Sequence, residues 1–197
     1  LKEEATEDVY RLAGTSEDER VHRSVFRAVR LRIPWLLASF VGGVLAAKVI
    51  GHYEGLLKDF LLLAGFIPVI LGMGGNIGTQ SATIVVRGLA TGRFNLRDIW
   101  RVVLKELAIG LILGMIYGGL IAVVAQARYS MVPLALAVGL AVLCSMSVAA
   151  LVGSLVPMLM ARINVDPAVA TGPFVTTAID IVSVFFYFQI AMTFMTM

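Results

Sequence analysis

GFIPVILGMGGNIGTQSATIVVRG, at residues 65–88, is the most informative segment of the chain. It belongs to an uncharged run, Phe60–Val86, which exceeds the roughly 20 residues of helix needed to cross a bilayer core. Between residues 72 and 83 the run carries four glycines and five polar side chains. Such a helix is poorly suited to face lipid, because its polar groups would lack partners there. We therefore predict a membrane span that packs against protein and lines a wet cavity, where a turn of broken helix could turn its carbonyl groups toward the water.

Four further apolar runs have comparable length, namely Ile33–Tyr53, Leu107–Ala127, Tyr129–Ala161 and Asp166–Met197. The 197-residue chain is 59% hydrophobic with a mean hydropathy of +0.90. Only 15% of its residues are charged, against roughly 25% in an ordinary soluble domain. This composition excludes a water-soluble globule. We expect an all-α integral membrane protein whose residues 33–197 form a domain of five transmembrane helices.

The basic residues are distributed unevenly between the two sides that these spans define. Of the 16 Lys and Arg residues, 13 lie in the amino-terminal 32 residues and in the connections after the second and fourth spans. Short cytoplasmic loops are enriched in Lys and Arg, so we expect a cytoplasmic amino end and an outside carboxyl end in the inner (plasma) membrane. The basic excess thus reflects topology, and we expect no nucleic-acid partner. One cysteine and two isolated histidines give no zinc or disulfide pattern.

The amino-terminal 32 residues differ in kind from the rest. Residues 1–14 predict an acidic amphipathic helix that ends at Gly14, and residues 15–32 predict a second cytoplasmic helix whose basic face lies against lipid headgroups. The acidic helix is either a solvated surface or a weak regulatory site for Mg²⁺ or Ca²⁺, formed by Glu3, Glu4, Glu7 and Asp8. Because the chain opens with Leu1, we expect that a cytoplasmic domain precedes it.

Asp180 is the only charged residue inside the last apolar run. If that helix begins at Asp166 and Pro167, Asp180 lies about 21 Å along it, near the middle of the bilayer. A buried carboxylate without a basic partner is expected to become neutral or to bind a cation. A structural protonated residue, a proton relay and a cation site are all compatible with this position. The nearby Thr, Gly and Asn oxygens favour a cation site, since they are hard ligands.

Two other patterns bear on function. Gly110, Gly114 and Gly118 recur every four residues, which predicts close helix packing and, as the alternative, a subunit interface. An intramembrane enzyme would need a nucleophile with a base, or paired carboxylates, and Asp180 has no such neighbour in sequence. A simple membrane anchor would not need polar residues at mid-membrane. We therefore expect a transporter and not an enzyme.

The run from Pro68 to Thr83, continuing into the Arg87-Gly-Leu-Ala segment, resembles the signature of the MgtE family of magnesium channels and transporters. The last apolar run resembles that family's final helix through VDPA at 165–168 and TTAID at 176–180. The acidic opening is similar to the plug helix that precedes the family's membrane domain. The resemblance implies a homodimer with a cation pore along its two-fold axis, lined by the second and fifth spans.

The resemblance also implies residue roles. Asp180 of each subunit would bind a hydrated Mg²⁺, and Asp166 would lie at the cytoplasmic mouth. The pore would be lined by Gly72, Gly75, Asn76, Thr79, Thr83, Gly172 and Thr176. Members of the family often carry Asn where this chain has Thr79 and Gly172, and they usually carry an N domain and paired CBS domains that are absent from this chain. The alternative is a transporter of another divalent cation, such as Co²⁺ or Mn²⁺, or a proton- or Na⁺-coupled exchanger.

Overall fold

The computed structural model describes residues 25–167 and 172–196, and this part of the chain is helical without a strand. The elements are α3 (Val25–His52), α4 (Glu54–Asp59), η1 (Leu61–Phe66), α5 (Ile67–Ala90), η2 (Leu96–Asp98), α6 (Ile99–Tyr129), α7 (Val132–Arg162) and α9 (Pro173–Met195). The helix predicted at 1–14, with Glu3, Glu4, Glu7 and Asp8, lies outside the described residues. So does most of the helix predicted at 15–32.

Five helical segments are long and apolar enough to cross a membrane. They are Val25–His52, Leu61–Ala90, Leu96–Tyr129, Val132–Arg162 and Pro173–Met195. This confirms the prediction of an all-α membrane protein with five spans. The second span is continuous helix from Ile67 to Ala90, so the suggested broken turn within it was wrong.

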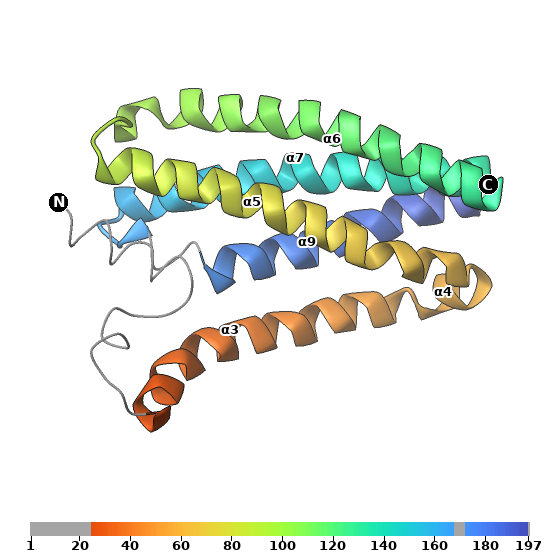
Figure 1. The fold of residues 1–197 in the computed structure, drawn as a ribbon, viewed down its shortest axis with the longest axis horizontal. Helices are drawn as coiled ribbons and strands as arrows, with labels where there is room; N and C mark the ends of the chain where they lie inside the picture. The colour runs from red at the N-terminus through yellow and green to blue at the C-terminus, as the bar shows by residue number, and fades with distance from the viewer. Residues whose placement is uncertain (1–24, 168–171, 197) are drawn as a thin grey trace.

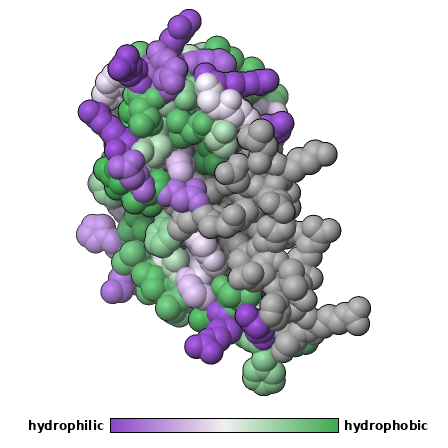
Figure 2. All heavy atoms as spheres, turned by 90° about the vertical axis from the view of Figure 1, so that its left-hand side faces the viewer, coloured by the Kyte–Doolittle hydropathy of each residue, from purple (hydrophilic) through white to green (hydrophobic). Residues whose placement is uncertain are grey.

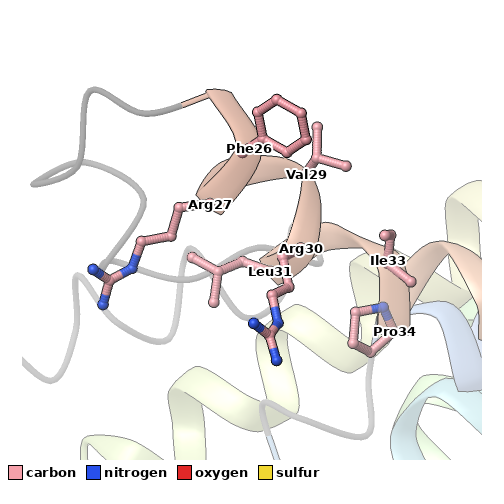
Figure 3. Close-up of a pocket in the computed structure, with 7 residues that line it drawn as sticks. All are labelled: Phe26, Arg27, Val29, Arg30, Leu31, Ile33 and Pro34. Carbon is pink, nitrogen blue, oxygen red and sulfur yellow. The ribbon is translucent and has the colours of Figure 1, made fainter.

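The first span begins earlier than the apolar pattern predicted. α3 continues through Pro34, so no helix boundary separates residue 32 from residue 33. Proline removes one main-chain hydrogen bond, which a long helix can tolerate with a bend. Figure 3 shows Arg27 and Arg30 on one side of the first turns of α3, with Phe26 and Val29 on the other. These residues line an open pocket of about 920 Å³. Within the described residues, basic and apolar side chains thus lie on different sides of the first turns of α3, and the cytoplasmic amphipathic helix at 15–32 stays a prediction.

α7 is the centre of the bundle and packs against α5, α6 and α9 (Figure 1). Small residues make this possible, because Ala137, Ala141, Ala149 and Ala150 on α7 are fully buried. α3 lies apart from α6 and α7 and meets the bundle mainly through α9. There the side chain of Thr177 packs directly on Gly42. The result is a four-helix bundle with a fifth helix along one side.

The glycine stripe of α6 is used for packing within the chain. A methyl group added at Gly110 would lie 2.9 Å from the carbonyl oxygen of Met146, and one at Gly114 would lie 3.0 Å from backbone atoms of Leu143. Gly118 faces Gly139 in the same way. These glycines allow α6 and α7 to approach closely along their length, which confirms the packing interpretation of the stripe.

Hydrophilic side chains gather around the end of the bundle where α5 ends and α6 begins, as seen in Figure 2. The connection there carries Arg93 and Arg97, and Arg87 lies in the last turn of α5. Large apolar side chains are exposed along the bodies of α3 and α6. Exposed apolar helix sides between polar ends are what a protein surrounded by lipid requires.

Candidate ion-conduction site

α5 has two contrasting sides. Gly74, Ile77, Gly78, Ser81 and Ala82 are buried against the bundle. The opposite side is open and polar, and it carries Gly72, Asn76, Thr79, Gln80 and Thr83 at helical spacing, with Gly75 at its edge. We call these six residues the open stripe. A polar stripe of this length inside a membrane span needs water or another protein surface beside it.

The glycines of α5 fall into two groups that match these two sides. A methyl group added at Gly72 or Gly75 would meet no atom within 4 Å, so both border open space. One added at Gly74 or Gly78 would collide with Ser145 or with Ile179, respectively. The first pair leaves the main chain of α5 accessible, and the second pair brings α5 close to α7 and α9.

Asp180 lies beside the middle of the second span. Its neighbour Ile179 packs on both Gly74 and Gly78, which are central in the span Leu61–Ala90. Asp180 therefore lies at the level of the open stripe. It is half-buried, and within the described part of the chain its carboxylate has no hydrogen-bond or ion-pair partner.

The start of the last span differs from the prediction. Pro167 is helical, but α9 itself begins at Pro173, and residues 168–171 between them lie outside the described residues. Proline is well suited to the first turn of a helix, so a helix can begin at either Pro167 or Pro173. Asp180 is thus seven residues, or about 10 Å, along α9 and not 21 Å. Its level beside the middle of the second span comes from the packing of Ile179 against α5, and the N-cap residue of α9 is Gly172 and not Asp166.

The threonine hydroxyls are oriented by their own helices. Thr79 Oγ1 donates to the carbonyl of Gly75 at 2.8 Å, and Thr83 Oγ1 donates to that of Thr79 at 2.8 Å. On α9, Thr176 Oγ1 lies 3.3 Å from the carbonyl oxygen of Gly172. A hydroxyl that donates its only proton to its own helix keeps its lone pairs free. The open stripe therefore presents oxygen acceptors, which suit a cation or its bound water molecules.

Buried hydrogen bonds hold α5, α7 and α9 in register behind these groups. The hydroxyls of Ser145 on α7 and Ser183 on α9 are hydrogen-bonded at 2.7 Å, and Ser145 Oγ lies 3.2 Å from the carbonyl oxygen of Ile70. Tyr187 on α9 donates to the carbonyl of Leu63 at 2.7 Å. In an apolar interior, satisfied polar contacts of this kind fix a unique arrangement. They support the position of Asp180 at the level of the open stripe.

Residues 67–190 match the model of the MgtE family, which is described as a family of divalent cation transporters. The chain belongs to the MgtE family. The match starts at the first residue of α5 and ends in α9, so it includes the open stripe and Asp180. The family is one of transporters and not of enzymes, as the sequence predicted.

Three curated magnesium transporters of the MgtE family are similar to the chain. The protein of Enterococcus faecalis is 40% identical over 195 residues, which are 99% of this chain and 43% of that relative. The Thermus thermophilus protein is 36% identical over 195 residues, 97% of this chain and 43% of the relative. The Bacillus subtilis protein is 32% identical over 191 residues, 97% of this chain and 42% of the relative. The chain thus spans less than half the length of these MgtE relatives.

The predicted MgtE pore residues within the described part of the chain lie on α5 and around the start of α9. The open stripe of α5 and Asp180 of α9 lie at one level, while Gly172 and Thr176 mark the start of α9. Asp166 precedes a segment outside the described residues, and its place at a pore mouth stays a prediction. Among the described residues, no three His, Cys, Asp or Glu side chains are grouped to hold a metal. A cation site near Asp180 would thus need ligands other than a carboxylate cluster of one chain.

Sequence reasoning missed one buried carboxylate, Glu106. It is 4% exposed and accepts a hydrogen bond of 2.8 Å from the hydroxyl of Ser81. The predicted span started at Leu107 because charged residues precede it, whereas α6 begins at Ile99. The spacing was informative, since Glu106 lies one turn before Gly110 and one turn after Val102 on the packing side of α6.

Proposed function

We propose that this chain is the membrane domain of a magnesium transporter that moves Mg²⁺ into the cytoplasm. The pore lies at the two-fold axis of a homodimer, and Asp180 of each subunit binds the hydrated cation. The observation that carries the proposal is the open stripe of α5 at the level of Asp180, whose carboxylate has no partner in the described chain. The three relatives are named as magnesium transporters, which supports Mg²⁺ as the ion.

A second subunit explains why the open stripe is tolerated inside a membrane. Lipid cannot satisfy Asn, Gln and Thr side chains or the accessible main chain at Gly72 and Gly75. Two copies related by a two-fold axis would enclose both stripes around a common water-filled path. The same symmetry would bring two Asp180 carboxylates to one level, with a combined charge that matches one divalent cation.

The chemistry of the stripe favours a cation that keeps its water. Mg²⁺ releases its bound water reluctantly and is usually held through few direct protein ligands. Water molecules around Mg²⁺ are hydrogen-bond donors, and the free lone pairs of Thr79 and Thr83 are acceptors. Gly72, Gly75 and Asn76 widen and polarise the same path. Gly172 and Thr176 at the start of α9, and Asp166 before it, would line its cytoplasmic end.

The direction of transport follows from charge and topology. With the amino end in the cytoplasm of an inner (plasma) membrane, Arg87 and Arg97 lie on the cytoplasmic side with most other basic residues. A potential of 100 mV, negative inside, favours entry of a divalent cation by about 4.6 kcal/mol, since each charge contributes about 2.3 kcal/mol. Regulation would come from cytoplasmic domains amino-terminal to this chain and from a cation site at Glu3, Glu4, Glu7 and Asp8.

The test is Mg²⁺ uptake into liposomes that contain the purified chain, measured with an internal fluorescent indicator. We expect Asp180→Asn to lose most of the Mg²⁺ flux, because the amide cannot balance the charge of the cation. Asp59→Asn is the matched control, since it makes the same change at an exposed residue of α4. Equal flux through wild type and Asp180→Asn would refute the role of the carboxylate.

Competition in the same liposomes tests the alternatives. Mg²⁺ uptake that resists excess Ca²⁺, Mn²⁺ and Co²⁺ is expected of a magnesium-selective pore. Preferential uptake of Co²⁺ or Mn²⁺ would identify a transporter of another divalent cation. Uptake that requires a proton or Na⁺ gradient at zero membrane potential would identify a coupled exchanger.

A further inference from the structure

Among the described residues, Glu106 on α6 is the most deeply buried Asp, Glu, Lys or Arg side chain. It is 4% exposed, its partner Ser81 is 1% exposed, and the two are joined by a hydrogen bond of 2.8 Å. No Lys, Arg or His among the described residues forms an ion pair with it. A buried carboxyl group is costly unless its contacts are specific, so this pair is expected to have a role.

The pair lies in an apolar layer between three helices. Val85 on α5, Val102 and Val103 on α6 and Met158 on α7 form one buried cluster, and Val85 is one turn from Ser81 while Val102 is one turn from Glu106. Water is largely excluded from such a cluster, and a hydrogen bond there is stronger than at a surface. Loss of the bond would leave a polar group without compensation.

The hydrogen bond also joins two helices that otherwise share few contacts. α6 packs along α7, and α5 packs on α7 and α9, while α5 and α6 make few close contacts with each other. Among the described residues, the bond from Ser81 to Glu106 is the only side-chain hydrogen bond that joins α5 and α6. It therefore adds a constraint on the rotation of α5 about its own axis, beside the close packing of Gly74 and Gly78 against α7 and α9.

Ser81 lies directly behind the open stripe. Successive helix residues are separated by about 100°, so Ser81 is about 200° from Thr79, on the other side of α5. The exposure pattern agrees, because Ser81 is buried while Thr79 and Thr83 are exposed. A rotation of α5 that moved Ser81 away from Glu106 would turn these two threonines by the same angle.

We infer that Glu106 is a positioning residue, which acts through Ser81 to aim Thr79 and Thr83 of the open stripe into the ion path. This inference rests on the proposed function for its consequence in transport. Its geometric content, the orientation of α5, does not depend on which ion is carried. The positioning role requires only an oxygen atom that accepts the hydrogen bond from Ser81, so the side-chain amide of glutamine can replace the carboxylate.

Four variants separate this role from others in the liposome assay. We expect Glu106→Ala and Ser81→Ala to lower Mg²⁺ flux about tenfold, the effect of losing one strong buried hydrogen bond. Glu106→Gln should retain at least about half of the wild-type flux, because its Oε1 still accepts from Ser81. The double variant Ser81→Ala with Glu106→Ala should be no worse than Glu106→Ala alone, since both changes break one contact.

A thiol-accessibility measurement reads the orientation of α5 without reference to flux. Cys144 is the only cysteine, so Cys144→Ala provides a clean background. In this cysteine-free protein, Thr83→Cys is labelled with a membrane-impermeant thiol reagent. The labelling rate should change at least about threefold when the same protein also carries Glu106→Ala. Glu106→Gln should restore the original rate. Thr193→Cys, an exposed site far along α9, is the control and should not respond.

Three results would overturn the inference. One is an unchanged labelling rate at position 83 in a folded Glu106→Ala or Ser81→Ala variant. Another is a Glu106→Gln variant as impaired as Glu106→Ala, which would mean that the charge itself matters. The third is a labelling change of the same size at position 193, which would indicate a general loss of structure. If Glu106→Ala does not fold, Ser81→Ala decides the question, because it removes a single oxygen atom. Wild-type protein without Mg²⁺ flux would refute the proposed function, while the labelling result would still decide the inference.

Discussion

Gly153 of α7 packs directly against the main chain of Gly78 on α5. A methyl group at Gly153 would collide with the carbonyl oxygen of Gly78 and lie 3.0 Å from its Cα and C atoms. These are backbone atoms, so no side-chain rotation can relieve the clash. Gly153→Ala therefore requires α5 and α7 to move apart.

The size of this effect can be worked out from the contact. Overpacking costs about 1–3 kcal/mol, and a main-chain clash belongs at the upper end of that range. Replacing glycine by alanine inside a helix returns about 1 kcal/mol. The expected net loss is about 2 kcal/mol, which corresponds to a melting temperature lower by about 4–8 °C for a chain of this size.

Gly119→Ala on α6 is the matched control, because a methyl group there would meet no atom within 4 Å. It should raise the melting temperature by about 2–4 °C, since only the helix-propensity gain remains. Both variants are measured by thermal unfolding of detergent-solubilised protein, followed by tryptophan fluorescence. Gly153→Ala should also lower Mg²⁺ flux, because Gly78 packs against Ile179 beside Asp180. A Gly153→Ala protein as stable as wild type would refute the close packing of α5 on α7.

Two further changes test the open stripe and its support. Thr83→Val keeps the shape of the side chain but removes the hydroxyl oxygen. If that oxygen accepts a hydrogen bond from the water of the hydrated cation, Mg²⁺ flux should fall about tenfold. Thr193→Val at the exposed end of α9 is the control and should leave Mg²⁺ flux unchanged. Tyr187→Phe removes the 2.7 Å hydrogen bond to the Leu63 carbonyl, and we expect the free energy of unfolding to fall by about 1–2 kcal/mol. Mg²⁺ flux should be largely kept, because Tyr187 lies away from the open stripe. Unchanged flux in Thr83→Val, or unchanged stability in Tyr187→Phe, would contradict these assignments.

The five spans could be predicted from the sequence because membrane crossing is a matter of length and hydropathy, which are local properties. The glycine stripe of α6 could be interpreted for the same reason, since every fourth residue lies on one helix side. The start of α9 could not be placed, because Asp166-Pro167 and Gly172-Pro173 are both good helix starts and the choice depends on tertiary packing.

Glu106 was missed because the predicted spans were ended at charged residues, which placed Glu106 just outside the third span. Its partner Ser81 is 25 residues away, and the packing of both α5 and α6 on α7 brings the two together. Sequence spacing places Glu106 on the same side as Gly110, but it gives no sign of which helix faces that side. Contacts between helices, unlike the helices themselves, depend on the three-dimensional arrangement of the bundle.

The glycines of α5 explain how one helix can both pack tightly and remain open. Gly74 and Gly78 are one turn apart and have no side chain where Ile179 packs, which places the next residue, Asp180, at the level of the stripe. Gly72 and Gly75 lie toward the other side, where they border open space. An alanine would have different consequences at the two kinds of position: a collision between helices at the first, and a methyl group in the open space beside α5 at the second. The sequence GMGGNIG therefore meets two separate requirements, which accounts for the density of glycine in a segment where helix propensity alone would disfavour it.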